Sequence, residues 1–284
     1  MADLPNRQLG RTGLQVTMPV TARWNCGAPR AQPTTDRQAE TILNTGINYI
    51  DTSIDYGVSE EHLASKCGCL VGAATAPVGQ FSPHIYTRDN IIADVEQSLI
   101  RMKADYLDLV QFHISPSQQT LQENGSVDAL MELKHAVKVR FIGMSGTLPH
   151  PRAMGVFDVF QIPYSAMERE HEAAIAAASR AGAVIVIRGG AAKGAPSEGK
   201  QRGLQWERWQ RARLYDLLGG MTAMEFILRF TFTNPDLDTT IVGTANPAHL
   251  HDNVAILQKG PLPTELYTEA KRRLAEAGSV PAGG

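Results

Sequence analysis

The chain has 284 residues, of which 43% are hydrophobic, and its formal net charge is −2. That length and apolar content are enough for one large α/β domain or two smaller ones. The charge is mixed and contains no basic block, which argues against nucleic acid or an anionic membrane as a partner.

The three cysteines, Cys26, Cys67 and Cys69, predict neither a disulfide framework nor a metal site. The Cys67–Cys69 pair lacks the two-residue spacer of common zinc and redox motifs, and no second pair completes a ligand set. The first residues contain no apolar signal region, and no apolar run approaches membrane-spanning length. We therefore expect a soluble, cytoplasmic protein.

Short β-rich runs recur along the chain and predict eight strands. They cover residues 16–21, 47–51, 63–67, 107–113, 140–145, 159–165, 184–190 and 239–244. Helical patterns lie between several of them, over residues 87–105, 167–182 and 220–235. Alternating strands and helices indicate a parallel sheet, and eight strands predict a (β/α)8 TIM barrel, with residues 1–284 as a single domain. An open doubly wound sheet is the alternative, but the chain has no Gly-x-Gly-x-x-Gly turn.

Several connections between the predicted strands are short. About eleven residues separate Asp51 from the strand expected at Leu63, whereas a parallel crossover needs a dozen or more. The interval 146–158 contains two prolines that break helices, and the first helix, roughly residues 36–44, is brief. We therefore expect shortened βα crossovers, with the helix after Asp51 reduced to a turn near Ser59–His62.

Polar residues lie at or near the carboxyl ends of several predicted strands, where the active sites of (β/α)8 barrels are found. They are Asp51, Lys66, His113, Ser145, Gln161 and Tyr164. Each alone has an ordinary structural explanation, such as a helix cap, a solvated lysine or a core histidine. Groups of complementary type at successive strand ends instead favour one shared site.

The chain resembles the aldo-keto reductases over nearly its whole length. The segments that carry the resemblance are "LGRTGLQVT", "GINYIDTSIDYG", "LASKCG", "SLIRMKADYLDLVQFH", "KVRFIGMSG", "FQIPYSAMERE" and "IVGTANPAHLHDN". They occur in the family's order, which is more specific than any single motif. The resemblance implies an N-terminal β-hairpin, a barrel, and reduction of a small-molecule carbonyl by NAD(P)H, without metal.

The same resemblance implies a catalytic group of four residues. Tyr56 would be the general acid, and Lys66 would lower the pKa of its phenol, which is near 10 in a free tyrosine. Asp51 would hold Lys66 in place, and His113 would orient the carbonyl oxygen. The cofactor would supply the hydride, while the protein supplies position and field.

The cofactor contacts implied by the resemblance come from the second half of the chain. Ser145 and Gln161 would bind the nicotinamide carboxamide, Tyr164 would stack on its ring, and Gly189 and Gly190 would lie along the pyrophosphate. The adenosine end would contact Gly243, Thr244, His249 and Asn253. NADP(H) is favoured by the family, and NAD(H) remains possible because no arginine occupies the matching positions.

The sequence departs from the family pattern at several of these places. Gly146 stands where the family has asparagine, Gly243 and His249 where a basic residue often grips the 2′-phosphate, and Ala22 and Arg23 where glycines usually end the first strand. These departures leave a second class of function open. The chain would then be a barrel that binds a nicotinamide nucleotide or a protein partner and turns over little or not at all.

Overall fold

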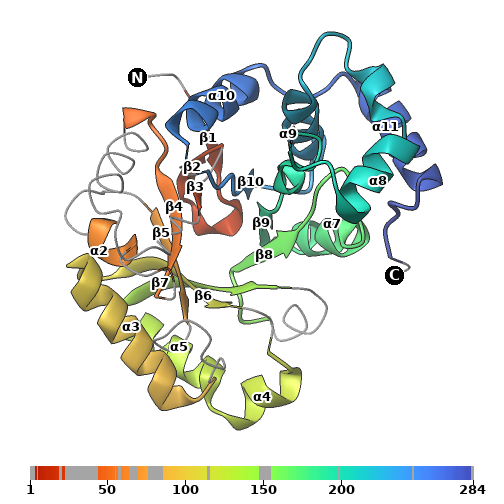
Figure 1. The fold of residues 1–284 in the computed structure, drawn as a ribbon. Helices are drawn as coiled ribbons and strands as arrows, with labels where there is room; N and C mark the ends of the chain where they lie inside the picture. The colour runs from red at the N-terminus through yellow and green to blue at the C-terminus, as the bar shows by residue number, and fades with distance from the viewer. Residues whose placement is uncertain are drawn as a thin grey trace.

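The computed structural model of the protein describes residues 4, 6–18, 21–22, 44–54, 56, 59–63, 70–75, 86–113, 116–146, 155–197, 199–244 and 246–282. A small antiparallel hairpin comes first, and after it helices separate most of the successive strands in the described residues (Figure 1).

The central feature of the fold is an eight-stranded sheet in which every neighbouring pair is parallel. Its strands are β3 (Thr21–Ala22), β4 (Tyr49–Ser53), β5 (Leu70–Thr75), β6 (Leu107–His113), β7 (Val139–Ser145), β8 (Val159–Pro163), β9 (Val184–Arg188) and β10 (Thr239–Thr240). They lie side by side in chain order, so each connection crosses to the adjacent strand. This is the (β/α)8 order, and the predicted fold class is confirmed.

Helices cover the outside of the sheet (Figure 1). They are α2 (Ser59–Leu63), α3 (Arg88–Met102), α4 (Gln118–Glu123), α5 (Ser126–His135), α7 (Glu172–Arg180), α8 (Gly203–Arg211), α9 (Ala223–Thr233), α10 (Pro247–Gln258) and α11 (Thr264–Glu276), with 3₁₀ turns η1 (Gly10–Thr12), η2 (Ala192–Gly194) and η3 (Leu214–Leu217). The three predicted helices correspond to α3, α7 and α9. The middle one starts five residues later than expected, because residues 165–168 form a bridged turn.

The ends of α3 and α9 show why these segments are helical. Thr87 and Thr222 precede them in extended conformation, and the Thr222 hydroxyl accepts a hydrogen bond from the Glu225 N–H. Along α3, Ile91 and Val95 are buried at the helical spacing expected from the sequence. Lys103, in the left-handed region at φ 52°, ends that helix.

The strand expected over residues 16–21 is two separate strands. Residues Gln15–Thr17 form β2, which pairs antiparallel with β1 (Asn6–Gln8), and the barrel strand β3 begins at Thr21. The N-terminal hairpin is thus confirmed. It closes the amino end of the barrel: its turn residue Gly10 lies so close to Val184 that a Cβ there would be 2.6 Å from the valine Cγ2.

The prediction of a strand over residues 63–67 is wrong at its first residue, Leu63. Leu63 ends α2, and the neighbour of β4 is β5, which starts at Leu70. The connection after Ser53 is therefore longer than the sequence suggested, although its helix has only five residues, as the expected turn near Ser59–His62 implied. This helix is anchored through Glu60, which accepts hydrogen bonds from Ser98 (2.6 Å) and Arg101 (3.3 Å).

The two largest apolar clusters among the described residues hold the sheet, the helices and the hairpin together. The larger lies between the sheet and the helices that surround it. The smaller lies inside the sheet and joins Leu9 and Val16 of the hairpin region to Leu109, Val159 and residues of the neighbouring strands. The hairpin thus seals the interior at the amino end, and polar side chains replace apolar ones toward the carboxyl end.

Candidate active site

Three polar side chains meet inside the barrel above the apolar cluster. They are Asp51 on β4, Gln111 on β6 and Gln161 on β8, all buried. The Gln111 Nε2 donates to Gln161 Oε1 at 2.8 Å and to Asp51 Oδ1 at 3.4 Å. Alternation along β6 explains the direction of Gln111: Leu109, Gln111 and His113 point inward, while Val110 and Phe112 join the outer core.

Burial dominates the electrostatics of Asp51. Asp51 is 6% exposed, and loss of hydration raises the pKa of its carboxyl group from 3.8 to about 7. Burial also raises the pKa of the nearby Tyr49 phenol well above its usual value. The neutral forms of both groups are therefore favoured at the bottom of the site.

Tyr56 and His113 come together, as the sequence predicted. Their rings meet edge to face, with centroids 6.1 Å apart and planes at 90°. Tyr56 is partly exposed and occupies a turn after β4, where its N–H donates to the Ser53 carbonyl at 2.9 Å. The last residue of β6 is His113, whose carbonyl accepts from the Tyr86 hydroxyl at 2.5 Å. A phenol and an imidazole thus share one side of the barrel mouth.

Lys66, the fourth member of the expected catalytic group, lies outside the described residues. The sequence predicted a strand over residues 63–67 with Lys66 near its end, whereas the observed strand β5 begins four residues after Lys66. The register pairs Asp51 with Gly72, so the β5 residue opposite the carboxyl has no side chain. The sequence contains no other lysine before Lys103.

Two of the expected cofactor residues also join this site. Ser145 ends β7, and the register places it between His113 of β6 and Gln161 of β8. Both Ser145 and Gln161 are 6% exposed. The Gly146 N–H donates to the Gln161 carbonyl at 2.9 Å, which ties the end of β7 to β8.

Tyr164 does not have the geometry expected of a stacking residue. Its side chain is fully buried in the outer core, where Tyr267 of α11 is among its neighbours. No face of the ring is open to a ligand in this structure. The position follows from the backbone: Tyr164 comes directly after β8, and its N–H donates to the Arg188 carbonyl at 3.2 Å.

Gly189 and Gly190 form the turn that follows β9. Gly189 has a φ of +77°, which favours glycine. A Cβ on Gly190 would lie 2.5 Å from Thr240 Oγ1 and 3.0 Å from Thr231 Cγ2, so packing alone requires glycine there.

The four residues expected at the adenosine end gather around the start of α10. Gly243 and His249 are exposed, and Asn253 is 8% exposed. Thr244 is partly buried, and its hydroxyl accepts from the Asn246 N–H at 3.1 Å, while Asn246 caps the helix. These four residues lie on the segment from β10 to α10. No hydrogen bond among the described residues joins them to Asp51, Tyr56 or His113.

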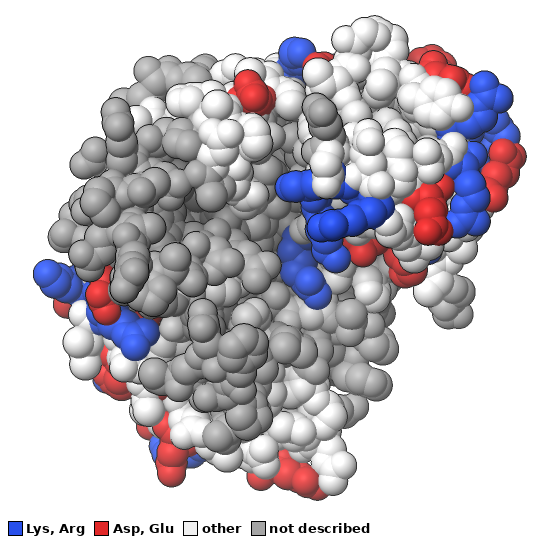
Figure 2. Space-filling view, in the orientation of Figure 1, with Lys and Arg blue, Asp and Glu red and all other residues white. Residues whose placement is uncertain are grey.

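Two features of the site are absent from the residues that the sequence predicted. Gln111 could have been found from its polar side chain on the inward face of an otherwise apolar strand. The other is a group of exposed cations on the segment from β9 to the start of α8, namely Arg188, Lys193, Lys200 and Arg202. Figure 2 shows Lys and Arg side chains gathered near the middle of the viewed face, close to β9.

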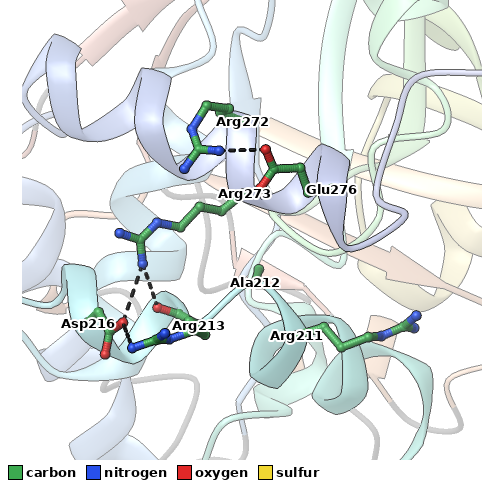
Figure 3. A pocket seen from close by; sticks show the side chains of 7 residues that line it. All are labelled: Arg211, Ala212, Arg213, Asp216, Arg272, Arg273 and Glu276. Carbon is green, nitrogen blue, oxygen red and sulfur yellow. Dashed lines mark hydrogen bonds and ion pairs between the residues drawn. The ribbon is translucent and has the colours of Figure 1, made fainter.

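A separate surface cavity of about 320 Å³ lies between the ends of α8 and α11. Figure 3 shows its lining residues, which are Arg211, Ala212, Arg213, Asp216, Arg272, Arg273 and Glu276. Ion pairs join most of these charges, including Arg213–Asp216 at 2.9 Å. Basic residues in the last turns of both helices also suit the helix dipoles, so the cavity has a structural explanation.

Comparison with known proteins agrees with this geometry. A sequence model described as the Aldo/keto reductase family matches residues 21–273. The chain belongs to the aldo/keto reductase family. Aldo-keto reductase YhdN of Bacillus subtilis (strain 168) is 29% identical over 184 residues, which are 58% of this chain and 55% of that protein. The chain spans 55%, 30% and 50% of the lengths of the first three curated relatives that it matches.

Solved aldo-keto reductases share the fold. Aldo-keto reductase AKR11C1 from Bacillus halodurans, in its holo form, is similar with a TM-score of 0.85 and 21% identity, over 95% of this chain and 96% of that one. Glycerol dehydrogenase AKR11B4 from Gluconobacter oxydans gives a TM-score of 0.82 at 21% identity, over 99% and 98% of the two chains. These likenesses show the (β/α)8 barrel fold.

Aldo/keto reductases are oxidoreductases that use a nicotinamide nucleotide, and most of the described site residues fit such a group. The buried polar pair Ser145 and Gln161 suits an amide, and the glycine turn with its flanking cations suits phosphates. Tyr164 does not fit its expected part. Among the described residues, no group of three His, Cys, Asp or Glu side chains could hold a metal ion. No described helix combines the length and apolar character needed to cross a membrane.

Proposed function

We propose that the protein reduces a carbonyl compound, an aldehyde or ketone, to an alcohol with NAD(P)H. The observation that carries the proposal is the edge-to-face contact of Tyr56 and His113 beside the buried Asp51–Gln111–Gln161 layer. A proton donor and a second hydrogen-bond donor, side by side at the carboxyl end of the barrel, are what a developing alkoxide requires. A small-molecule substrate and a cytoplasmic location are part of the same proposal.

Tyr56 acts as the general acid in this mechanism. Its partly exposed phenol is the group that donates a proton to the carbonyl oxygen. His113 donates a hydrogen bond to the same oxygen and thereby orients the carbonyl carbon. Donors of this kind are worth roughly 3 kcal/mol each at the transition state. When bound, the nicotinamide nucleotide supplies the hydride.

In this proposal, an ion pair between Asp51 and Lys66 controls the pKa of the Tyr56 phenol. Lys66 is the only lysine before Lys103, so any ammonium supplied to Asp51 from the first third of the chain must be this one. If the pair forms, the ammonium lowers the pKa of the Tyr56 phenol. If the pair does not form, the burial of Asp51 favours a neutral carboxyl group. Tyr56 must then donate its proton without a nearby ammonium that lowers the pKa of its phenol.

The nucleotide is held by residues of the second half of the chain. Ser145 and Gln161 bind the carboxamide, the 189–194 turn follows the pyrophosphate, and Thr244, His249 and Asn253 contact the adenosine end with Gly243. We favour NADP(H) over NAD(H) because it is the nucleotide that the family resemblance favours. The exposed cations Arg188, Lys193, Lys200 and Arg202 suit the pyrophosphate, which both nucleotides contain.

A purified sample, NADPH or NADH, and a panel of aldehydes and ketones test the proposal by the loss of nicotinamide absorbance. Titration of tryptophan fluorescence with each nucleotide measures binding separately. Turnover that disappears in Tyr56→Phe while nucleotide affinity is kept supports the assigned acid. Turnover that persists in that variant contradicts it.

The second function keeps nucleotide binding and gives up catalysis. It is favoured by β5, whose residues opposite Asp51 and Ser53 are Gly72 and Ala74 and which contains no ionisable side chain. A barrel of this kind would bind NADPH or NADH, or a protein partner, and reduce none of the carbonyl panel. Binding without turnover would therefore favour the second function.

A further inference from the structure

Gln111 places a buried amide where an apolar side chain would give a more stable fold. It is fully buried inside the barrel, and its Oε1 has no hydrogen-bond partner among the described residues. A buried amide oxygen without a partner lowers stability. The inward residue before it on β6 is Leu109, which packs in the inner apolar cluster. The amide therefore requires an explanation other than packing.

The two hydrogens of Gln111 Nε2 have two acceptors on two other strands. One acceptor is Asp51 Oδ1 at 3.4 Å, on β4, and the other is Gln161 Oε1 at 2.8 Å, on β8. Because the Gln161 oxygen faces Gln111, the amide nitrogen of Gln161 is turned the other way. One side chain thus determines which end of Gln161 is available at the barrel mouth.

The Gln111 side chain must cross β7 to reach Gln161, and the sequence of β7 leaves space for it. β7 lies between β6 and β8, and its residue beside Gln111 is Gly143. A Cβ at Gly143 would lie 3.1 Å from Gln111 Cγ and 2.8 Å from the Val159 carbonyl oxygen. The glycine lets the long amide side chain pass over β7 and reach Gln161.

We propose that Gln111 is a positioning residue that holds the Asp51 carboxyl group and the Gln161 amide in one fixed arrangement, so that Gln161 presents its amide nitrogen to the nicotinamide carboxamide. The role of Gln161 in this statement rests on the proposed function. The link between Gln111 and Asp51 does not, because it is a contact within the chain. The two parts can therefore be tested separately.

A double-mutant cycle tests the first part through nucleotide binding rather than activity. Gln111→Met keeps the length of the side chain and removes its amide, and Gln161→Met removes the presented group. Loss of one hydrogen bond predicts that Gln111→Met weakens NADPH or NADH binding about fivefold to tenfold. The double variant should bind no worse than Gln161→Met alone, because Gln111 acts through Gln161.

Infrared titration of the Asp51 carboxyl group tests the second part without any nucleotide. The signal is assigned by its disappearance in Asp51→Asn. Removing the Gln111 donor removes a hydrogen bond that favours the charged form, so Asp51 should titrate at a higher pH in Gln111→Met. Gln111→Asn, one methylene shorter, cannot span Gly143 and should behave alike, and it serves if the methionine variant does not fold.

Val110→Ala is the matched control, because Val110 is equally buried on the same strand but points into the outer core. It should lower stability without changing nucleotide affinity or the Asp51 titration. Additive effects in the cycle, or an Asp51 titration that Gln111→Met leaves unchanged, would overturn the positioning role. If the wild-type protein binds neither nucleotide, the proposed function fails, and the infrared titration alone decides whether Gln111 holds Asp51.

Discussion

Replacing Asp51 by asparagine should stabilise the protein, and more so as the pH rises. Asparagine has nearly the same shape and can still accept from Gln111 Nε2, but it cannot ionise. In the folded protein, burial raises the pKa of Asp51 from 3.8 to about 7. The wild-type protein must therefore ionise a buried carboxyl group at alkaline pH, which costs stability.

The size of the effect follows from linkage. Between about pH 4 and pH 7 the folded state binds more protons than the unfolded state, so the stability of the wild-type protein falls as the pH rises through this window. A pKa difference of about three corresponds to a penalty of about 4 kcal/mol above pH 7, as an upper limit. From about pH 5 to pH 8 the advantage of the asparagine variant should grow by roughly 2 to 3 kcal/mol.

Urea denaturation of both proteins, followed by tryptophan fluorescence at pH values from about 5 to 8, measures this difference. Glu225→Gln provides a control of opposite sign, because hydrogen bonds and ion pairs with Lys259 and Arg229 hold the pKa of Glu225 below its usual value. Its loss should reduce stability at neutral pH and matter less in acid. If Asp51→Asn instead destabilises the protein increasingly as the pH rises, Asp51 is ionised and paired with a cation, and the reasoning from burial is refuted.

Four further variants test the site and the fold. Tyr56→Phe should lower carbonyl reduction by at least about a hundredfold with little change in nucleotide affinity, and retained activity would remove its role as general acid. Lys66→Met should shift the pH–rate profile if its ammonium tunes the phenol, whereas an unchanged profile would exclude the pairing. Gly190→Ala should cost about 1 to 3 kcal/mol in urea denaturation, since its Cβ would meet Thr240, and an unaltered midpoint would contradict that close approach. Arg169→Met should cost about 1 to 3 kcal/mol, because the buried guanidinium donates to the Lys271 and Ser279 carbonyls. The cost should be smaller in a chain that ends before Ser279, which keeps only the Lys271 acceptor, and an equal cost in both chains would contradict the contact with Ser279.

Local patterns in the sequence were sufficient to predict most of the fold. Six of the eight barrel strands and the helix at residues 88–102 follow from the spacing of apolar residues and from caps within the same segment. The hairpin was expected from the resemblance of "LGRTGLQVT" to the family. The meeting of Tyr56 and His113 was also predictable, because the ends of parallel strands converge once a barrel is assumed. These features depend on neighbours in the sequence or on a general property of the fold.

The remaining features depended on competition between distant segments. Two short runs, residues 63–67 and 70–75, could each have been the strand beside β4, and the pairing of Asp51 with Gly72 selected the second. Whether Tyr164 faces a ligand or the core was decided by α11, which packs Tyr267 against it from a hundred residues away. The bridge from Asp51 through Gln111 to Gln161 joins three strands, and only their register brings the three side chains together. A single sequence contains no local signal for such contacts, because their energy arises only when the whole sheet has closed.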